Sequence, residues 1–232
     1  MKVFLIPTFI GDHSPQCAFT QFQLNKIMEI NVFIAENVKT ARRHLLRMGY
    51  VNNLDDVVFY GMGKHSRTDD LAEIFEKYPD RSIGVISEAG MPAVADPGAD
   101  FVAMAQKRGI PCIPMVGPSS ILMALSASGL NGQNFAFCGY LPIDSSSRRK
   151  EIISLENESR KKHRTQIFIE TPFRNDKLFN DFLSTLNPKT HLCIACNILC
   201  SDEWILTKTV EEWRKDAPKI GKNQVIFLFL AD

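Results

Sequence analysis

The sequence predicts an α/β protein with two α/β domains, the first with a mainly parallel sheet and flanking helices and the second with a mixed sheet and helices. Short apolar segments typical of buried strands alternate with helical segments through the first half of the chain, and this alternation produces parallel sheets covered by helices. After a break at residues 129–132, strands outnumber helices. The chain has 232 residues, enough for two small cores. We expect domains at residues 1–118 and 119–232.

The predicted elements follow from apolar periodicity and from residues that end helices. Strands are expected at residues 2–7, 32–35, 57–60, 82–86 and 111–115, and in the second half at 135–140, 166–170, 191–197, 203–209 and 224–230. Helices are expected at 40–48, 69–77, 99–108, 121–127, 146–160 and 175–186. Gly109 is placed to end the third helix. Ser119 or Ser120 can cap the fourth helix, which we expect to bury Leu122 and Leu125.

The composition is that of an ordinary globular protein and selects no charged partner. Lys and Arg total 27 against 26 for Asp and Glu, which gives a net charge of +1. No apolar stretch approaches the ~18 residues of a membrane span, and the apolar run after Lys2 is too short for a signal peptide. We therefore expect a cytoplasmic protein without a membrane contact.

Three of the six cysteines form a C-x2-C-x3-C pattern that superficially suggests a metal site. Cys193 and Cys196 fall on a predicted strand, where residues an odd number apart point to opposite faces. Small buried hydrophobic side chains in a reducing cytosol explain them better. We predict no metal.

Two loops rich in Gly, Pro and small residues, at 87–98 and 117–120, each follow a predicted buried strand. Open α/β sheets bind ligands at the carboxyl ends of their strands, and glycine lets the backbone approach a ligand closely. We expect these strand ends to be adjacent and to frame one cleft, with donors from Ser119, Ser120 and the amides of the following helix.

Other motifs are less specific. The segment Gly61-Met62-Gly63-Lys64 lacks the first glycine of a phosphate-binding loop and is interpreted as a turn. Glu170-Thr171-Pro172-Phe173-Arg174 follows a strand and is either a surface pair at a helix start or a substrate-orienting pair. Basic clusters at 42–47, 148–150 and 160–164 would bind phosphates if two of them bordered one cleft.

Together these segments resemble the tetrapyrrole-methylase-like superfamily of S-adenosylmethionine-dependent methyltransferases, and within it the small-subunit ribosomal-RNA ribose 2′-O-methyltransferase branch. The resemblance is sharpest over residues 117–130 and extends to Gly139-Tyr140-Leu141-Pro142, to 170–174 and to 87–98. Glu88 and Met91 replace Asp and Thr of the family pattern, and residues 195–200 replace a charged family segment. The printed chain ends without the C-terminal extension that those enzymes usually carry.

The resemblance implies a homodimer whose cofactor, S-adenosylmethionine, lies in a cleft between the two domains. It places cofactor contacts at Pro7, Glu88, Met91, Asp96, Pro97, Gly117, Pro118, Ser119, Ser120, Thr171, Asn197 and Gln224. Glu88 or Glu170 could serve as a general base or only orient ligand, and Arg174 is the candidate for a substrate phosphate. The expected activity is methyl transfer to ribosomal RNA, free or in the small subunit. The alternatives are a tetrapyrrole or other small-molecule methyltransferase and a non-catalytic cofactor-binding relative.

Overall fold

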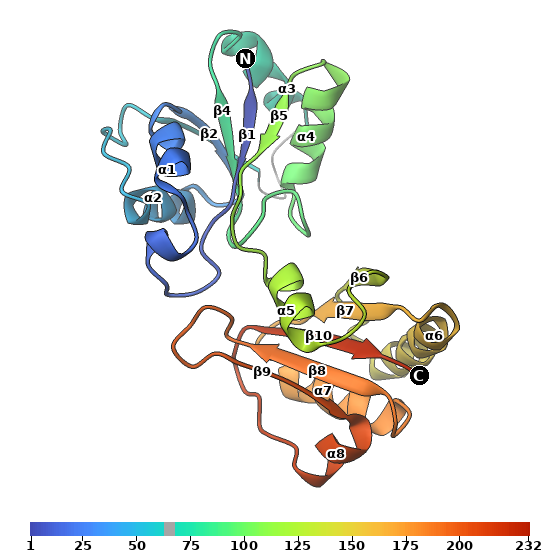
Figure 1. The fold of residues 1–232 in the computed structure, drawn as a ribbon. Helices are drawn as coiled ribbons and strands as arrows, with labels where there is room; N and C mark the ends of the chain where they lie inside the picture. Colours follow the sequence, from blue (N-terminus) through green and yellow to red (C-terminus); the bar gives the residue numbers. More distant parts are fainter. Residues whose placement is uncertain (63–67) are drawn as a thin grey trace. The chain divides into compact units, whose positions relative to one another are not determined.

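The computed structural model describes residues 1–62 and 68–232 (Figure 1). The chain divides into two compact units, Met1–Ser119 and Ser120–Asp232, and each is described by itself. Both units are α/β, which confirms the predicted fold class. Among the described residues, no helix has the length and apolar character that a membrane crossing requires.

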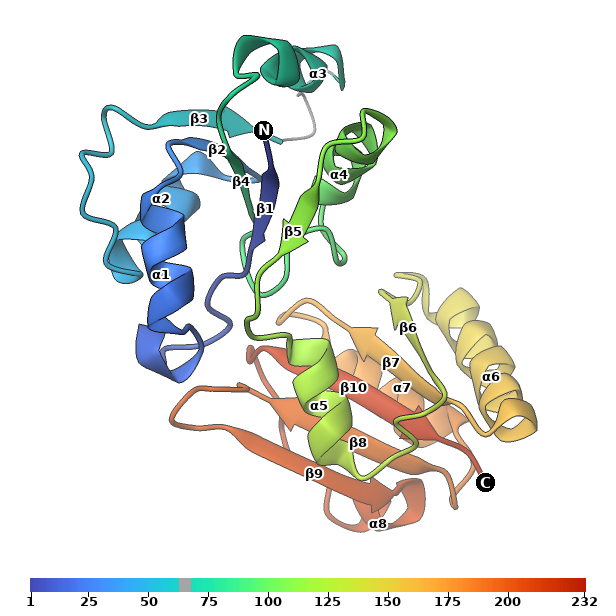
Figure 2. The same cartoon turned by 45° about the horizontal axis from the view of Figure 1, so that its top comes forward.

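The first unit contains a five-stranded parallel sheet. Its strands are β1 (Val3–Ile6), β2 (Val32–Ala35), β3 (Val58–Gly61), β4 (Ile83–Ile86) and β5 (Cys112–Pro114), in the order β3-β2-β4-β1-β5 (Figure 2). All five predicted strands are present, and each end lies within two residues of its predicted position. The carboxyl ends of all five strands therefore lie at one edge of this sheet.

Helices cover both faces of this sheet because the strand side chains are apolar on both sides. The helices are α1 (Gln21–Met28), α2 (Val38–Arg47), α3 (Thr68–Lys77) and α4 (Gly98–Lys107), with a short 3-10 turn, η1, at Pro15–Cys17. Phe4 and Phe33 pack toward α1 and α2, whereas Val3 and Val32 pack toward α3 and α4. Strand side chains alternate between the two faces, so one sheet supports two apolar cores.

Helix α1 was not among the predicted elements, although the sequence carries a signal for it. The Thr20 hydroxyl accepts a hydrogen bond from the Gln23 backbone amide, and the Gln23 side chain accepts one from the Thr20 amide. This reciprocal pair of hydrogen bonds is a capping box, which the sequence pattern Thr-x-x-Gln predicts. The Thr209 and Glu212 pair marks the other unpredicted α-helix, α8 (Val210–Lys215), in the same way.

The second unit contains a mixed sheet, as predicted. Its strands are β6 (Phe135–Gly139), β7 (Thr165–Ile169), β8 (His191–Cys196), β9 (Trp204–Thr209) and β10 (Val225–Leu230), in the order β6-β7-β10-β8-β9. Only β6 and β7 pair in parallel, and the other neighbours are antiparallel. Helices α6 (Ser145–Lys162), α7 (Asn175–Thr185) and α8 cover one face, where Phe168, Phe182 and Phe229 form the core.

Helix α5 (Ser120–Ser128) covers the other face of this sheet, against β8, β9 and β10 (Figure 2). It buries Ala124, Leu125 and Ser128, but Leu122 is 55% exposed, so the prediction that Leu122 is buried was wrong. Apolar residues lie all around this helix, and its periodicity therefore could not select a face. The small side chains of Ala124 and Ser128 let the helix approach the strands closely.

The cysteines of β8 point to opposite faces of the sheet, as the strand prediction required. Cys196 packs with Leu192 and Ile194 in the core under α7, whereas Cys193 is buried outside that core. Burial raises the pKa of each thiol to about 11. Both are therefore neutral thiols at physiological pH, and metals bind the thiolate.

Candidate active site

The carboxyl ends of β4 and β5 carry the two loops, at 87–98 and 117–120, that were expected to form the site. The two loops were expected to follow adjacent strands, and this was wrong because β1 lies between β4 and β5 in the sheet. Strand order in an α/β sheet is set by crossover connections, and a single strand pattern does not encode it. Strand β1, whose loop begins at Pro7, therefore lies between the two strands.

Three loops meet around Gly90. The Thr8 amide donates a hydrogen bond to the Gly90 carbonyl at 2.9 Å. Gly90 has a φ of +71°, and a Cβ at this position would lie 3.3 Å from Ile10 and 3.6 Å from the Pro118 carbonyl oxygen. Glycine is thus required here both by its backbone conformation and by the close approach of neighbouring loops.

The contact between Pro7 and Gly117 is still closer. A Cβ on Gly117 would lie 2.3 Å from Pro7 Cβ and 2.4 Å from Pro7 Cγ. The loop after β5 therefore lies directly against the ring that follows β1. The structure thus brings together Pro7, Gly117 and Pro118, three of the residues that were expected to contact the cofactor.

The loop after β4 holds an unusual backbone. Ala93 and Ala95 have φ values of 65° and 57°, in the left-handed region that non-glycine residues rarely adopt. The Asp96 carboxylate accepts a hydrogen bond from the Gly98 amide at 2.9 Å at the start of α4. Strained backbone of this kind clusters at ligand-binding sites, because surrounding structure must hold it in place.

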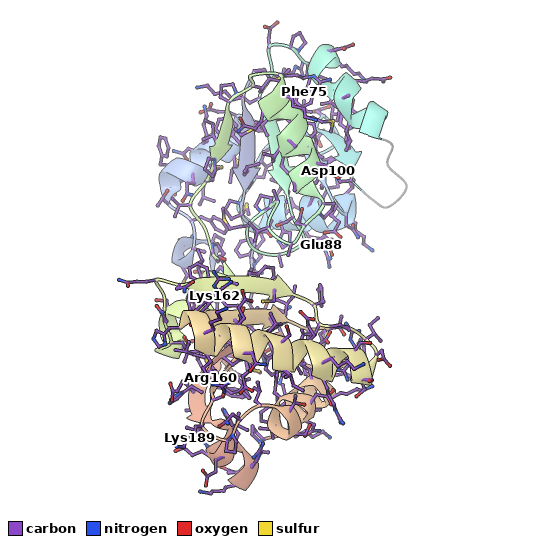
Figure 3. All side chains as sticks on the ribbon, turned by 90° about the vertical axis from the view of Figure 1, so that its right-hand side faces the viewer. Phe75, Glu88, Asp100, Arg160, Lys162 and Lys189 are labelled. Carbon is purple, nitrogen blue, oxygen red and sulfur yellow. The ribbon has the colours of Figure 1, made fainter. Side chains whose placement is uncertain are left out.

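Three carboxylates gather at the same edge of this sheet. Burial raises the pKa of Glu36, and the charges of Asp96 and Glu88 raise it further. Burial also raises the pKa of Asp96, while hydrogen bonds from the Gly98 and Ala93 amides partly oppose the shift. Glu88 itself is exposed on the loop after β4 (Figure 3). Three carboxylate side chains therefore lie at this edge, and negative charge attracts a cationic ligand.

His44 and Phe9 support this loop, and the sequence analysis assigned neither of them a role. His44 Nε2 donates a hydrogen bond to the Glu88 carbonyl at 3.0 Å, and its ring stacks on Phe9 with centroids 5.8 Å apart. The Arg47 guanidinium lies 3.9 Å from the Phe9 ring centroid and donates to the Gly11 carbonyl at 3.0 Å. His44 and Arg47 lie three residues apart on α2 and therefore on one face of the helix, and this spacing was the sequence signal for their shared role.

In the second unit, Glu170 and Arg174 form one compact ion pair at the carboxyl end of β7. Arg174 Nε and Nη2 lie 2.9 and 2.5 Å from Glu170 Oε1, which also accepts from the Thr171 amide at 2.6 Å. The Glu170 side chain is 2% exposed and the Arg174 side chain 26%. The carboxylate therefore orients the guanidinium, and Arg174 is the member of the pair that solvent reaches.

Asn197 follows β8 and Gln224 precedes β10, so both lie at the same edge of the mixed sheet as the carboxyl end of β7. Asn197 has a φ of 49°, its Oδ1 accepts from the Gln224 amide at 3.0 Å, and its Nδ2 donates to Asp202 and Asn223 at 2.7 and 3.1 Å. The Asn197 side chain is thus occupied in fixing loops. Two residues that the sequence analysis missed, Asn175 and Asn223, extend this network, because Asn175 Nδ2 donates to the Asn223 carbonyl at 2.8 Å.

The expected site residues consequently fall into two groups, one in each unit. The first unit holds Pro7, Glu88, Met91, Asp96, Pro97, Gly117, Pro118 and Ser119, and the second holds Ser120, Glu170, Thr171, Arg174, Asn197 and Gln224. Within the first group Pro97 precedes α4, and within the second Ser120 begins α5. Of the turn expected at residues 61–64, Gly63 and Lys64 lie outside the described residues.

The basic clusters do not border one phosphate site within the second unit, because residues 148–150 and 160–164 lie at opposite ends of α6. Arg148 is buried and pairs with the Asp181 carboxylate at 2.5 Å. The 160–164 cluster ends α6 just before β7 begins, and Figure 3 shows Arg160 and Lys162 at that end of the helix. Glu170 follows the opposite end of β7, roughly 16 Å away along five strand residues. The 42–47 cluster supports loops through Arg47.

Comparison with known proteins gives sequence relatives named ribosomal RNA small subunit methyltransferase I. No protein-family model matches the chain. The ribosomal RNA small subunit methyltransferase I of Vibrio cholerae serotype O1 is 28% identical over 97% of this chain and 76% of its own length, and that of Escherichia coli O157:H7 is 26% identical over 98% and 77%. The protein of the same name from Halalkalibacterium halodurans is 36% identical over 69% of this chain, which corresponds to 53% of its length.

Solved structures with the same fold include methyltransferases named for uroporphyrin and for cobalt precorrin. The methyltransferase CobJ aligns with a TM-score of 0.63 at 12% identity, covering 99% of this chain and 94% of its own. The cobalt precorrin-4 methyltransferase CbiF gives 0.60 at 13%, with the same coverage. The uroporphyrin-III C-methyltransferase from Thermus thermophilus complexed with S-adenyl homocysteine gives 0.56 at 13%, over 99% and 97%. At these identities the likeness shows the fold.

Proposed function

We propose that this chain, a methyltransferase with relatives among the small-subunit ribosomal RNA methyltransferases and the fold of the tetrapyrrole methyltransferases, methylates a ribose 2′-hydroxyl of ribosomal RNA. The observation that carries the proposal is the meeting of the three strand-end loops around Gly90 in a chain with these relatives. The methyl donor is S-adenosylmethionine, which the name of one structural neighbour's bound ligand also supports.

The residues of the first unit fit this cofactor chemically. S-adenosylmethionine carries a sulfonium and an ammonium, and its sulfonium supplies an already activated methyl group. Glu36, Glu88 and Asp96 supply negative charge at the same sheet edge, and the repulsion from Asp96 and Glu88 adds to burial in raising the pKa of Glu36. A cationic ligand relieves that repulsion. Pro7 and Gly117 pack closely against each other, and the backbone of their two loops would contact the cofactor.

The second unit supplies the group that we assign to the RNA. Arg174 is fixed by Glu170 and by the Thr171 hydroxyl, whose oxygen lies 3.1 Å from Arg174 Nε. Because a preoriented guanidinium suits phosphate, we assign Arg174 to a phosphate of the acceptor strand. Glu170 then acts as its positioning residue. With the nucleophile and the methyl carbon aligned, proximity supplies most of the rate acceleration and no metal is needed.

We extend the proposal to the partners and the location. The acceptor is ribosomal RNA in the small subunit or before its assembly, the enzyme acts in the cytoplasm, and it works as a homodimer. Sedimentation velocity of the purified chain tests the dimer, and a single species of monomer mass would contradict it. The fold alone is equally compatible with a tetrapyrrole acceptor, so the acceptor assay includes one.

The decisive assay is transfer of labelled methyl from S-adenosylmethionine. The acceptors are purified small ribosomal subunits lacking their native ribose methylations, free ribosomal RNA and a tetrapyrrole mixture. We expect label in RNA at one linkage that resists alkali. Label in the tetrapyrroles, or cofactor binding by calorimetry without transfer to any acceptor, would refute the RNA assignment.

Variants at the ion pair separate the two ligands. Arg174→Ala is expected to lower methyl transfer to RNA while leaving cofactor affinity nearly unchanged, and Glu170→Ala is expected to do the same because it frees the guanidinium. Calorimetry with S-adenosylmethionine and steady-state transfer are measured on each variant. If cofactor affinity falls in parallel with transfer, both residues belong to the cofactor site.

A further inference from the structure

Two large aromatic side chains are exposed on neighbouring loops of the second unit. Phe173, in the loop after β7, is 79% exposed, and Tyr140, directly after β6, is 58% exposed. Strands β6 and β7 run parallel, with Gly139 opposite Phe168, so both loops leave the same edge of the sheet (Figure 2). Clustered exposed apolar groups mark interaction sites, whereas single ones do not.

One cation lies near Phe173 in space and another follows it in the sequence. Lys222 Nζ lies 4.9 Å from the centroid of the Phe173 ring, a cation–π contact. Lys222 precedes β10, which pairs antiparallel with β7 so that Ile226 lies opposite Ile169, and this brings residue 222 to the carboxyl end of β7. Arg174 follows Phe173 directly. The ring thus contacts one lysine, and the next residue in the sequence carries the guanidinium that Glu170 orients.

A ring with flanking cations matches the chemistry of an unpaired nucleotide. Bases of single-stranded RNA stack on aromatic side chains, and the adjoining phosphates are bound by Lys and Arg. Lys222 covers one face of the Phe173 ring. Because Phe173 is highly exposed, the opposite face of the ring is available for a base. A duplex does not offer an unstacked base for this contact.

We propose that Phe173 and Lys222 form a binding site for one unpaired nucleotide of RNA, with the base stacked on Phe173 and its phosphate bound by Lys222. This inference rests on the proposed function, because it assigns a second contact to the same RNA that Arg174 binds. It further specifies the substrate class, since the acceptor region must be single-stranded at this nucleotide.

The test measures RNA binding by the full chain with a short fluorescent single-stranded RNA of mixed sequence and with the same RNA as a duplex. Phe173→Ala is expected to weaken single-strand binding about 5- to 100-fold, which corresponds to loss of one stacked base. Phe173→Trp is expected to retain binding because it keeps an aromatic face. Lys222→Ala is expected to reduce the slope of log affinity against log salt by about one.

Phe22→Ala is the matched control, because Phe22 is also 79% exposed but lies on α1 of the first unit. It is expected to leave RNA affinity unchanged. Thermal unfolding and calorimetric affinity for S-adenosylmethionine are measured on every variant, and neither is expected to change at Phe173.

Several outcomes would overturn the inference. One is equal single-strand affinity for Phe173→Ala and the unsubstituted chain, and another is loss of binding in Phe173→Trp as large as in Phe173→Ala. A change of sedimentation coefficient without a change in RNA affinity would instead identify a contact between protein chains. If the chain still transfers methyl to small subunits under any of these results, the proposed function survives. If the chain transfers no methyl to RNA but Phe173→Ala weakens single-strand binding and Phe173→Trp retains it, only the proposed function is refuted.

Discussion

The substitution Gly117→Ala probes the contact on which the first half of the site depends. The added methyl carbon would lie 2.3 and 2.4 Å from two carbons of the Pro7 ring. Because nonbonded carbons are optimally ~3.5–4.0 Å apart, the two loops must separate by about 1.2 Å. The proline ring cannot rotate away, since it is closed on its own backbone. The backbone of one loop must therefore move.

Two magnitudes follow from that displacement. Overpacking of a well-packed site costs about 1–3 kcal/mol, so the free energy of unfolding is expected to fall by that amount. A displacement of about 1 Å in a positioning loop can lower the rate of the chemical step about 100-fold. We expect both effects, with the loss of methyl transfer larger than the loss of stability would explain.

Urea unfolding, calorimetry with S-adenosylmethionine and methyl-transfer rates measure the three quantities. Gly132→Ala is the control, because nothing lies within 4 Å of its added methyl and its φ is not positive. Pro7→Gly removes both ring carbons, and a double-mutant cycle with Gly117→Ala should give a favourable coupling energy. If Gly117→Ala matches the control in stability and in cofactor affinity, the close contact is not what fixes these loops.

Three further predictions concern charge and burial. Arg148→Ala is expected to lower the free energy of unfolding in urea by about 3–5 kcal/mol, because it leaves Asp181 buried without its main partner; a loss below about 1 kcal/mol would contradict this. The raised pKa of Glu36 means that the folded state binds the Glu36 proton more tightly than the unfolded state does. The free energy of unfolding therefore falls as the pH rises above 4.5, the ordinary pKa of this carboxyl. Glu36→Gln should therefore stabilise the chain at pH 7 but not at pH 4, and equal effects at both pH values would refute the sign. With its pKa near 11, Cys193 should resist iodoacetamide at pH 8 in the folded protein while the exposed Cys17 reacts, and rapid labelling of Cys193 read by mass spectrometry would show that β8 opens.

Local patterns in the sequence were sufficient for most elements. The apolar runs at 32–35 and 225–230 are strands because their side chains are buried on both faces, and Gly109 ends α4 with a φ of +67°. The two unpredicted α-helices both begin with capping boxes, so their signals were present in residues such as Thr20 and Thr209. Leu122 shows the limit of periodicity, because α5 is apolar on every side.

The sequence alone is enough to identify which residues follow strands and which of them are small, charged or aromatic, since these properties depend on neighbours along the chain. It could not determine that β1 separates β4 from β5, that Pro7 packs against Gly117, or that Arg174 is already held by Glu170. Those relations join residues far apart along the chain or depend on the rotamers that packing selects. Only tertiary structure decides them, because strand order and side-chain partners are set by the packing of the whole sheet rather than by any local segment.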